Sequence, residues 1–77
     1  MQKQTQRIER LHKLMERNAT GTPKECAQRL GISERQLYNT LELMRGMGAP
    51  IIYNTHSNTY LYEYDVDWKI GFSKKLG

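Results

Sequence analysis

The stretch Pro23–Leu41, which reads PKECAQRLGISERQLYNTL, decides the fold of this chain. It contains two helix starts of the same kind. Thr22 stands three residues before Glu25, and Ser33 stands three residues before Gln36. A Thr or Ser that caps a helix, with a Glu or Gln three residues later that returns to the amide of the cap, forms a capping box. The stretch therefore predicts two helices, each beginning just after its capping residue.

The residues between the two helix starts predict how the helices meet. A close crossing needs a small residue, which Ala27 supplies, and the turn needs a residue that accepts positive φ, which Gly31 supplies. Ile32 can fill the gap between the helices. The inward faces are apolar at Cys26, Leu30, Leu37 and Leu41. This is the spacing of a helix-turn-helix, which we assign to residues 23–46.

A third helix is predicted before this unit, over residues 3–18. Its apolar residues recur at steps of three and four, as in an amphipathic helix: Ile8, Leu11, Leu14 and Met15. His12 lies beside this stripe. We interpret it as a packing or surface residue, because no second His or Cys stands at metal-ligand spacing.

After Pro50 the apolar period falls from near four to two, which predicts strands. A hairpin is expected over residues 51–64, with strands on either side of the turn-forming run Asn54–Asn58. The alternation continues, but Asp65 and Asp67 suggest a bend partway, so a third extended piece is expected over residues 65–77, ending in a frayed tail from Ser73. The residues expected on one buried face are Tyr60, Tyr62, Tyr64, Val66, Trp68, Ile70 and Phe72.

The stretch Pro23–Leu41 resembles the helix-turn-helix of bacterial winged-helix DNA-binding domains. Within it, LGISERQLY is similar to a run common in the small N-terminal domains of DeoR-type regulators. The resemblance covers about residues 5–64. It implies a single α+β winged helix-turn-helix domain over residues 1–77, with three helices, a β-hairpin wing and a short extra extended segment.

The resemblance also implies that residues 34–45 form a recognition helix that enters the major groove of double-stranded DNA. The residues expected to contact bases are Glu34, Arg35, Gln36, Tyr38 and Asn39. Arg35 suits guanine, and Asn39 or Gln36 suits adenine, through paired hydrogen bonds. Glu34 can accept from cytosine or simply favour the positive end of the helix. The residues expected to contact the DNA backbone are Thr22, Lys24, Ser33, Arg45, His56 and Asn58.

Two features keep another interpretation open. The expected wing tip, residues 54–58, has no Lys or Arg, and in the expected recognition helix two Glu balance Arg35 and Arg45. Winged helices also serve as protein-interaction modules, so an adaptor or structural subunit is the alternative to a small transcriptional or mobile-element regulator. A homodimer is conceivable through helix 3–18 or Val66–Phe72, although Trp68 and Phe72 are expected to close the chain's own core.

The charge is unevenly distributed along the chain. The net charge is +4 and the isoelectric point is near 9.4. Residues 1–46 hold nine Lys or Arg against five Glu, whereas residues 47–77 hold three of each sign. A basic excess confined to the helical half points to an anionic partner such as nucleic acid.

Size and composition argue against other classes of function. A chain of 77 residues is small for an enzyme, and its one cysteine, Cys26, falls on an inward helix face as an inert filler. We expect no cofactor, no metal and no small-molecule ligand. The N-terminal residues lack an apolar signal sequence, and no apolar run approaches the roughly 20 residues of a membrane helix. The expected location is therefore the cytoplasm.

Overall fold

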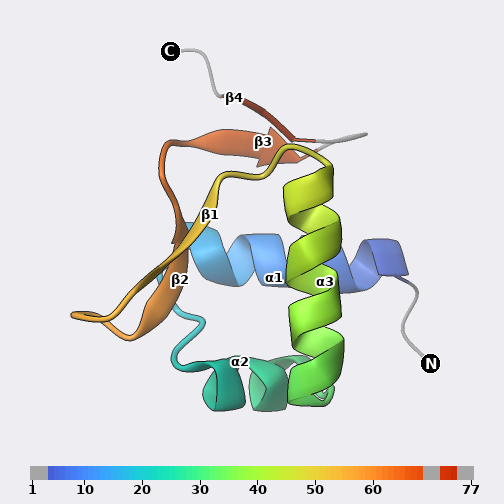
Figure 1. Cartoon of the computed structure of the whole chain (residues 1–77), viewed down its shortest axis with the longest axis vertical. Helices are drawn as coiled ribbons and strands as arrows, with labels where there is room; N and C mark the ends of the chain where they lie inside the picture. The colour runs from blue at the N-terminus through green and yellow to red at the C-terminus, as the bar shows by residue number, and fades with distance from the viewer. Residues whose placement is uncertain (1–3, 69–71, 75–77) are drawn as a thin grey trace.

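The computed structural model describes residues 4–68 and 72–74 (Figure 1). Three helices come first and two short hairpins follow. The elements are α1 (Gln4–Glu16), α2 (Pro23–Leu30), α3 (Glu34–Gly46), β1 (Ile51–Asn54), β2 (Thr59–Tyr62), β3 (Val66–Trp68) and β4 (Phe72–Lys74). Three helices followed by a two-stranded antiparallel hairpin form the α+β layout of a winged helix-turn-helix, as the sequence predicted.

Both predicted capping boxes are formed. The Thr22 hydroxyl accepts from the Glu25 amide at 3.3 Å, and the Glu25 carboxylate accepts from the Thr22 amide at 3.1 Å. Ser33 and Gln36 repeat the arrangement at 3.1 and 3.0 Å. α2 ends at Gly31, which has a left-handed φ of 70°. The local signals in this stretch therefore set the limits of α2 and the start of α3.

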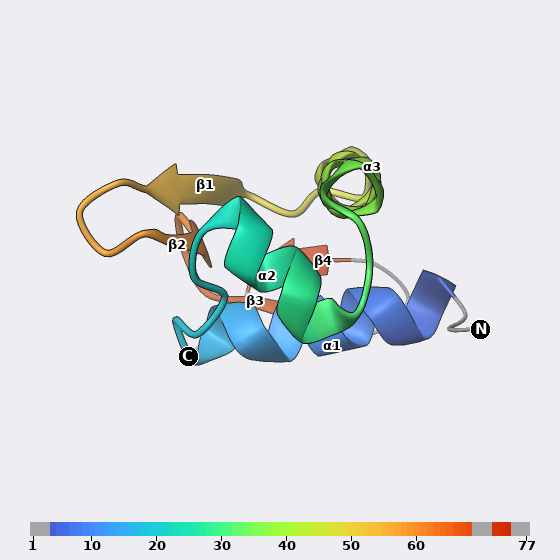
Figure 2. The same cartoon turned by 90° about the horizontal axis from the view of Figure 1, so that it is seen from below.

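The core lies between the helices and the first hairpin. Figure 2 shows α3 and β1 on one side of the molecule and α1 on the other, with α2 between them. Ile32 packs against this core, as expected of a residue that fills the gap after the turn. The buried apolar residues that form the core are Ile8, Leu11, Met15, Cys26, Ala27, Leu30, Leu37, Leu41, Met44, Ala49, Ile51 and Tyr60.

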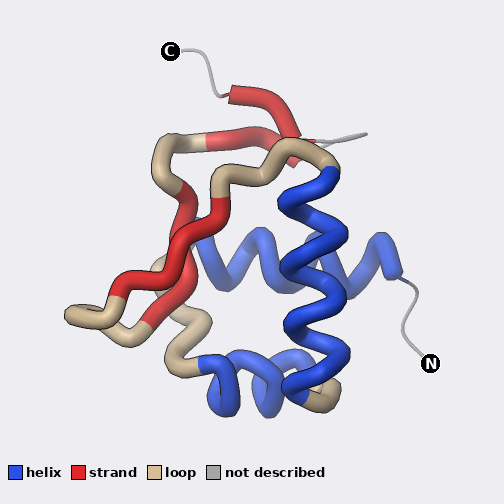
Figure 3. The backbone as a smooth tube through the Cα atoms, viewed as in Figure 1, coloured by secondary structure: helices blue, strands red, loops and turns tan. Residues whose placement is uncertain are grey.

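The wing is the hairpin of β1 and β2, whose tip projects away from the helices (Figure 3). Its strands pair from Ile51 opposite Tyr62 to Asn54 opposite Thr59. At the tip, the Asn54 side-chain oxygen accepts from the amides of His56 and Ser57 at 2.8 and 3.2 Å. This side-chain turn, rather than a glycine, reverses the chain.

Buried hydrogen bonds attach the wing to the helical half. The Thr20 hydroxyl lies 2.8 Å from the Thr59 hydroxyl and accepts from the Tyr60 amide, also at 2.8 Å. His12 Nδ1 lies 2.8 Å from the Tyr62 hydroxyl. Thr20 and Thr59 are buried. The sequence pattern did not predict these contacts, because the partners are far apart in the chain.

The C-terminal prediction is wrong in three respects. The described residues of this region do not lie along a single extended segment, because β3 pairs with β4 in antiparallel orientation. Ser73 and Lys74 belong to β4 and are not frayed. Tyr64 is 45% exposed rather than buried, because the chain bends after Tyr62 and interrupts the alternation. Two further predictions concern residues that lie outside the described side chains. They are the core role of Trp68, Ile70 and Phe72 and the frayed tail at residues 75–77.

The described part of the chain holds no helix with the length and apolar character needed to cross a membrane. The apolar stripe of α1 packs in the chain's own core.

Candidate nucleic-acid interface

The outward face of α3 is fixed by its buried face. Leu37, Leu41 and Met44 are at most 1% exposed. Their burial turns Arg35, Tyr38 and Asn39 outward, and all three side chains are exposed. The three residues therefore lie together on one helix face, as predicted for base contacts. This face presents a guanidinium group, a phenol and an amide, which are groups that can read base edges.

Gln36 differs from its predicted neighbours on α3. Its amide oxygen accepts from the Ser33 amide at 3.0 Å, and its backbone carbonyl accepts from the Thr40 hydroxyl. The Gln36 side chain also lines a depression together with Arg7 of α1. It lies at the edge of the outward face, and its amide oxygen is used within the protein. Glu34 is exposed in the first turn of α3, where a carboxylate stabilises the helix.

The start of α2 already holds a negative charge. Hydrogen bonds from the backbone and side chain of Thr22 hold the pKa of Glu25 below its usual range. The Thr22 hydroxyl also donates to the Glu25 carboxylate at 2.9 Å. The free amides and Thr22 were expected to hold a DNA phosphate here, but a carboxylate at the same end repels one. A phosphate contact at this end would depend on the exposed Lys24.

The two ends of α3 have balanced charge. Arg45 in the last turn pairs with Glu42 at 3.1 Å, and both side chains are exposed. Arg35 and Glu34 stand at the other end. An exposed ion pair of this type leaves the arginine able to exchange partners, because such pairs contribute little stability.

Tyrosines fill the junction between α3 and the wing. The rings of Tyr53 and Tyr60 meet edge to face with centroids 4.9 Å apart. Burial, and then the nearby phenol of Tyr38, raise the pKa of Tyr60 to about 12. The half-exposed Tyr38 therefore stands where α3 adjoins the wing. His56 and Asn58 are exposed at the wing tip, where Asn58 has a left-handed φ of 50°.

Cys26 is buried, as expected, and burial raises the pKa of its thiol to about 11. The thiol therefore stays protonated and weakly nucleophilic near neutral pH. His12 is nearly buried and contacts Tyr62 and Glu16, which agrees with a packing role. Within residues 4–68 and 72–74, no three His, Cys, Asp or Glu side chains gather closely enough to hold a metal ion.

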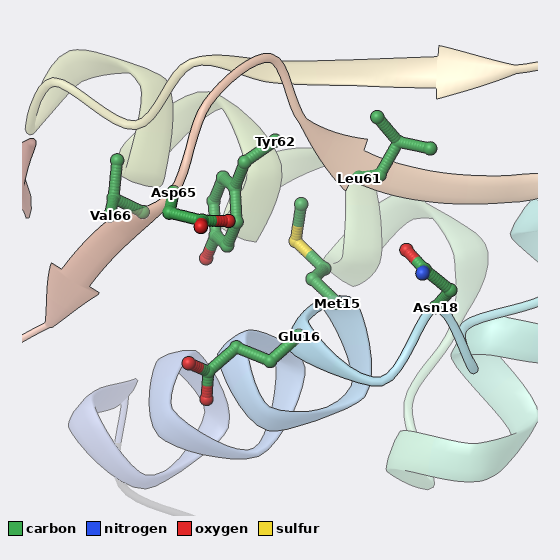
Figure 4. A pocket seen from close by; sticks show the side chains of 7 residues that line it. All are labelled: Met15, Glu16, Asn18, Leu61, Tyr62, Asp65 and Val66. Atoms are coloured by element: carbon green, nitrogen blue, oxygen red, sulfur yellow. The ribbon is translucent and has the colours of Figure 1, made fainter. Parts of the chain in front are cut away.

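An acidic depression of about 320 Å³ lies between the end of α1 and the β2–β3 corner. In the view of Figure 4 the Asp65 carboxylate overlaps the Tyr62 ring, the Glu16 carboxylate lies below both on α1, and Asn18 lies at the far end. Burial and the nearby Glu16 raise the pKa of the Tyr62 phenol well above its usual range. This corner does not suit a DNA phosphate, because it presents negative charge.

The sequence reasoning missed a basic surface on α1 and α2. It consists of Arg7, Arg10, Lys13, Arg17 and Arg29, which line two adjoining depressions of about 480 and 210 Å³. The signal was present in the sequence, since the four cations of the first helix recur at steps of three and four residues. Counting charges along the chain, without their helical spacing, did not reveal it.

Comparison of the chain with protein-family models, with curated proteins and with solved structures found no match.

Proposed function

We propose that this protein binds double-stranded DNA with sequence preference, inserting the start of α3 into the major groove, as a small transcriptional or mobile-element regulator. The observation that carries the proposal is the outward face of α3. Arg35, Tyr38 and Asn39 are exposed there on a helix whose opposite face is anchored in the core. A helix held in this way presents its polar side chains in a fixed register, which direct reading of bases requires.

The roles within this interface differ. Arg35 reads guanine and Asn39 reads adenine, each through a pair of hydrogen bonds. Tyr38 contacts a phosphate or a thymine methyl beside the wing. Lys24 and Arg45 contact the backbone, Arg45 after leaving Glu42. Ser33, His56 and Asn58 contribute weaker backbone contacts, because Ser33 already serves as a cap and the wing tip lacks Lys and Arg.

The first test is a mobility-shift titration with random duplex DNA at two salt concentrations. DNA binding predicts an affinity that falls by orders of magnitude between about 50 and 200 mM salt. Sequences selected from a random duplex pool then identify the site and whether it is palindromic. Absence of binding at the lower salt concentration would rule out the proposal.

Variants identify the face that binds. Combined Arg35→Ala and Asn39→Ala should weaken binding to the selected site by about tenfold or more and relax base preference, because each good pair contributes about 1–3 kcal/mol of discrimination. Lys24→Ala should weaken binding to all DNA sequences by a similar factor. The matched control is Arg17→Ala, which removes an equal charge on α1. If the control relaxes base preference and the α3 variant does not, α3 is not the recognition helix.

The alternative is a winged helix that binds another protein without binding DNA. The balanced charge of α3 and the wing tip without Lys or Arg favour it. The salt titration separates the two functions, because only the DNA-binding protein retains random duplex at low salt.

A further inference from the structure

The basic surface defined above lies on α1, on the residue that follows it and on α2. Arg7, Arg10 and Lys13 of α1 and Arg17 just after it recur at helical spacing, so they follow one side of the chain over about 15 Å. Arg29 of α2 adjoins them, and both depressions include Arg10 and Arg29. Figure 2 shows α1 on the side of the molecule opposite α3 and β1. Because Gln36 at the start of α3 also lines the larger depression, a duplex held by α3 would leave accessible chiefly the smaller depression, which no α3 residue lines.

In the part of the chain that the structure describes, no ion pair joins these cations to an Asp or Glu, although Arg29 stands one helical turn after Glu25 and attracts its carboxylate. No Asp or Glu lines either depression. Arg10 donates to the backbone carbonyl of Arg29 at 3.4 Å, and Arg29 donates to the carbonyl of Ala19. The Nε of Arg7 has no hydrogen-bond partner among the described residues but is buried, so an added acceptor would reach the exposed Arg10, Lys13 and Arg29 instead.

Aliphatic residues also line the surface. Leu14 and Leu30 line the smaller depression together with the cations, and Leu30 and Ile32 line the larger one. Leu14 and Ile32 are half-buried against the core. A DNA backbone offers only the small methylene groups of its sugars, and no extended aliphatic side chain, to cover these residues. A protein segment with carboxylates beside leucines has both, because arginine pairs with carboxylates in fixed geometry.

We propose that the basic surface of Arg7, Arg10, Lys13, Arg17 and Arg29 binds an acidic, amphipathic segment of a partner protein. The carboxylates of the segment pair with the arginines, and its leucines cover Leu14 and Ile32. This proposal does not depend on DNA binding by α3. If both hold, one molecule contacts a duplex on one side and a protein on the other.

The test uses a fluorescent synthetic helical peptide with leucines at steps of three and four residues, flanked by glutamates. A second peptide carries glutamine in place of each glutamate. Fluorescence anisotropy should detect binding of the acidic peptide and not of its neutral counterpart. Equal binding of the two peptides, or no binding of the acidic one, would overturn the proposal.

Paired variants locate the site. Combined Lys13→Gln and Arg17→Gln should weaken peptide binding by about tenfold or more, since bonds to charged groups are being lost. Both side chains are exposed, so thermal unfolding should be unchanged. The control, Lys24→Gln with Arg35→Gln, removes the same charge elsewhere and should leave peptide binding intact while weakening duplex binding.

Three results contradict the assignment. The control pair weakens peptide binding as much as the test pair does. The test pair weakens binding of a short duplex but leaves peptide binding unchanged, so the surface serves DNA. Wild-type protein self-associates in sedimentation and the test pair abolishes this, so the occupant is the acidic depression of a second copy. Loss of duplex binding alone contradicts the proposed function and leaves the peptide site standing.

Discussion

The helix-turn-helix and the wing adjoin each other, yet different kinds of contact hold them in place. The helix-turn-helix combines apolar packing with caps that span three residues, such as Ser33 with Gln36. The wing packs Ile51 and Tyr60 on the core but also depends on buried hydrogen bonds to Thr20 and His12. Apolar packing is non-directional, whereas hydrogen bonds are directional. The position of α3 is thus set by apolar packing and local caps, and that of the wing by apolar packing together with a few buried polar atoms.

The largest loss of stability is expected from a substitution in the packed core of the helix-turn-helix. Leu41→Ala should lower the free energy of unfolding by about 2–5 kcal/mol, because a fully buried leucine leaves a cavity. Tyr38→Ala, three residues away on the exposed face, should change it by less than about 1 kcal/mol. Urea denaturation measures both. Similar costs for the two variants would mean that the faces of α3 are misassigned.

The next effect tests the polar attachment of the wing. Thr20→Val should lower the free energy of unfolding by about 1–3 kcal/mol, because the buried Tyr60 amide and Thr59 hydroxyl lose the hydroxyl that both contact. Thr40→Val is the matched control, since Thr40 is equally buried but bonds only within α3. Thr40→Val should lower the free energy of unfolding by less than Thr20→Val does in the same urea titration. The reverse order would show that the wing does not depend on Thr20.

A smaller effect is expected at the turn of the helix-turn-helix. Gly31→Ala should lower the free energy of unfolding by about 1–2 kcal/mol, because the left-handed φ at this position strains any residue with a Cβ. The added Cβ itself would meet open space. Gly46→Ala at the end of α3 also meets open space, without a left-handed φ. It should be neutral or slightly stabilising. Thermal unfolding of the pair separates backbone strain from lost contacts, and equal melting temperatures would contradict the left-handed turn.

The smallest expected effect is a dependence of stability on pH, which appears only at alkaline pH. Burial raises the pKa of Tyr60 from 10 to about 12, and it also raises the pKa of Tyr62. A raised folded-state pKa contributes stability that is fully present below pH 10 and is lost as pH rises toward the folded value. The free energy of unfolding should therefore fall between pH 10 and 12, and less steeply in Tyr60→Phe. An unchanged slope in that variant would contradict the buried phenol.

Local signals predicted the helix-turn-helix well. The caps at Thr22 and Ser33 and the turn at Gly31 lie within a few residues of the groups they satisfy, so sequence spacing is sufficient to find them. The same spacing placed Leu37 and Leu41 inward and thereby Arg35 outward.

Contacts between distant residues were not predicted. The pairing of Thr20 with Thr59 joins positions 39 residues apart, and no local pattern marks either threonine as buried. The second hairpin was missed because alternation over residues 60–72 is the same for one long strand or two paired strands. The capping role of Gln36 was predicted, but its place beside Arg7 depends on how α1 packs.

The hydrogen bond between His12 and Tyr62 joins residues 50 positions apart. Closing so long a segment carries an entropic cost before the contact forms, whereas the caps and turn of the helix-turn-helix need only neighbouring residues. We expect the helical half to form first during folding and the wing to dock last. The same order in reverse makes the wing the first part to open, so amides of β2 should exchange with solvent before those at the centre of α3.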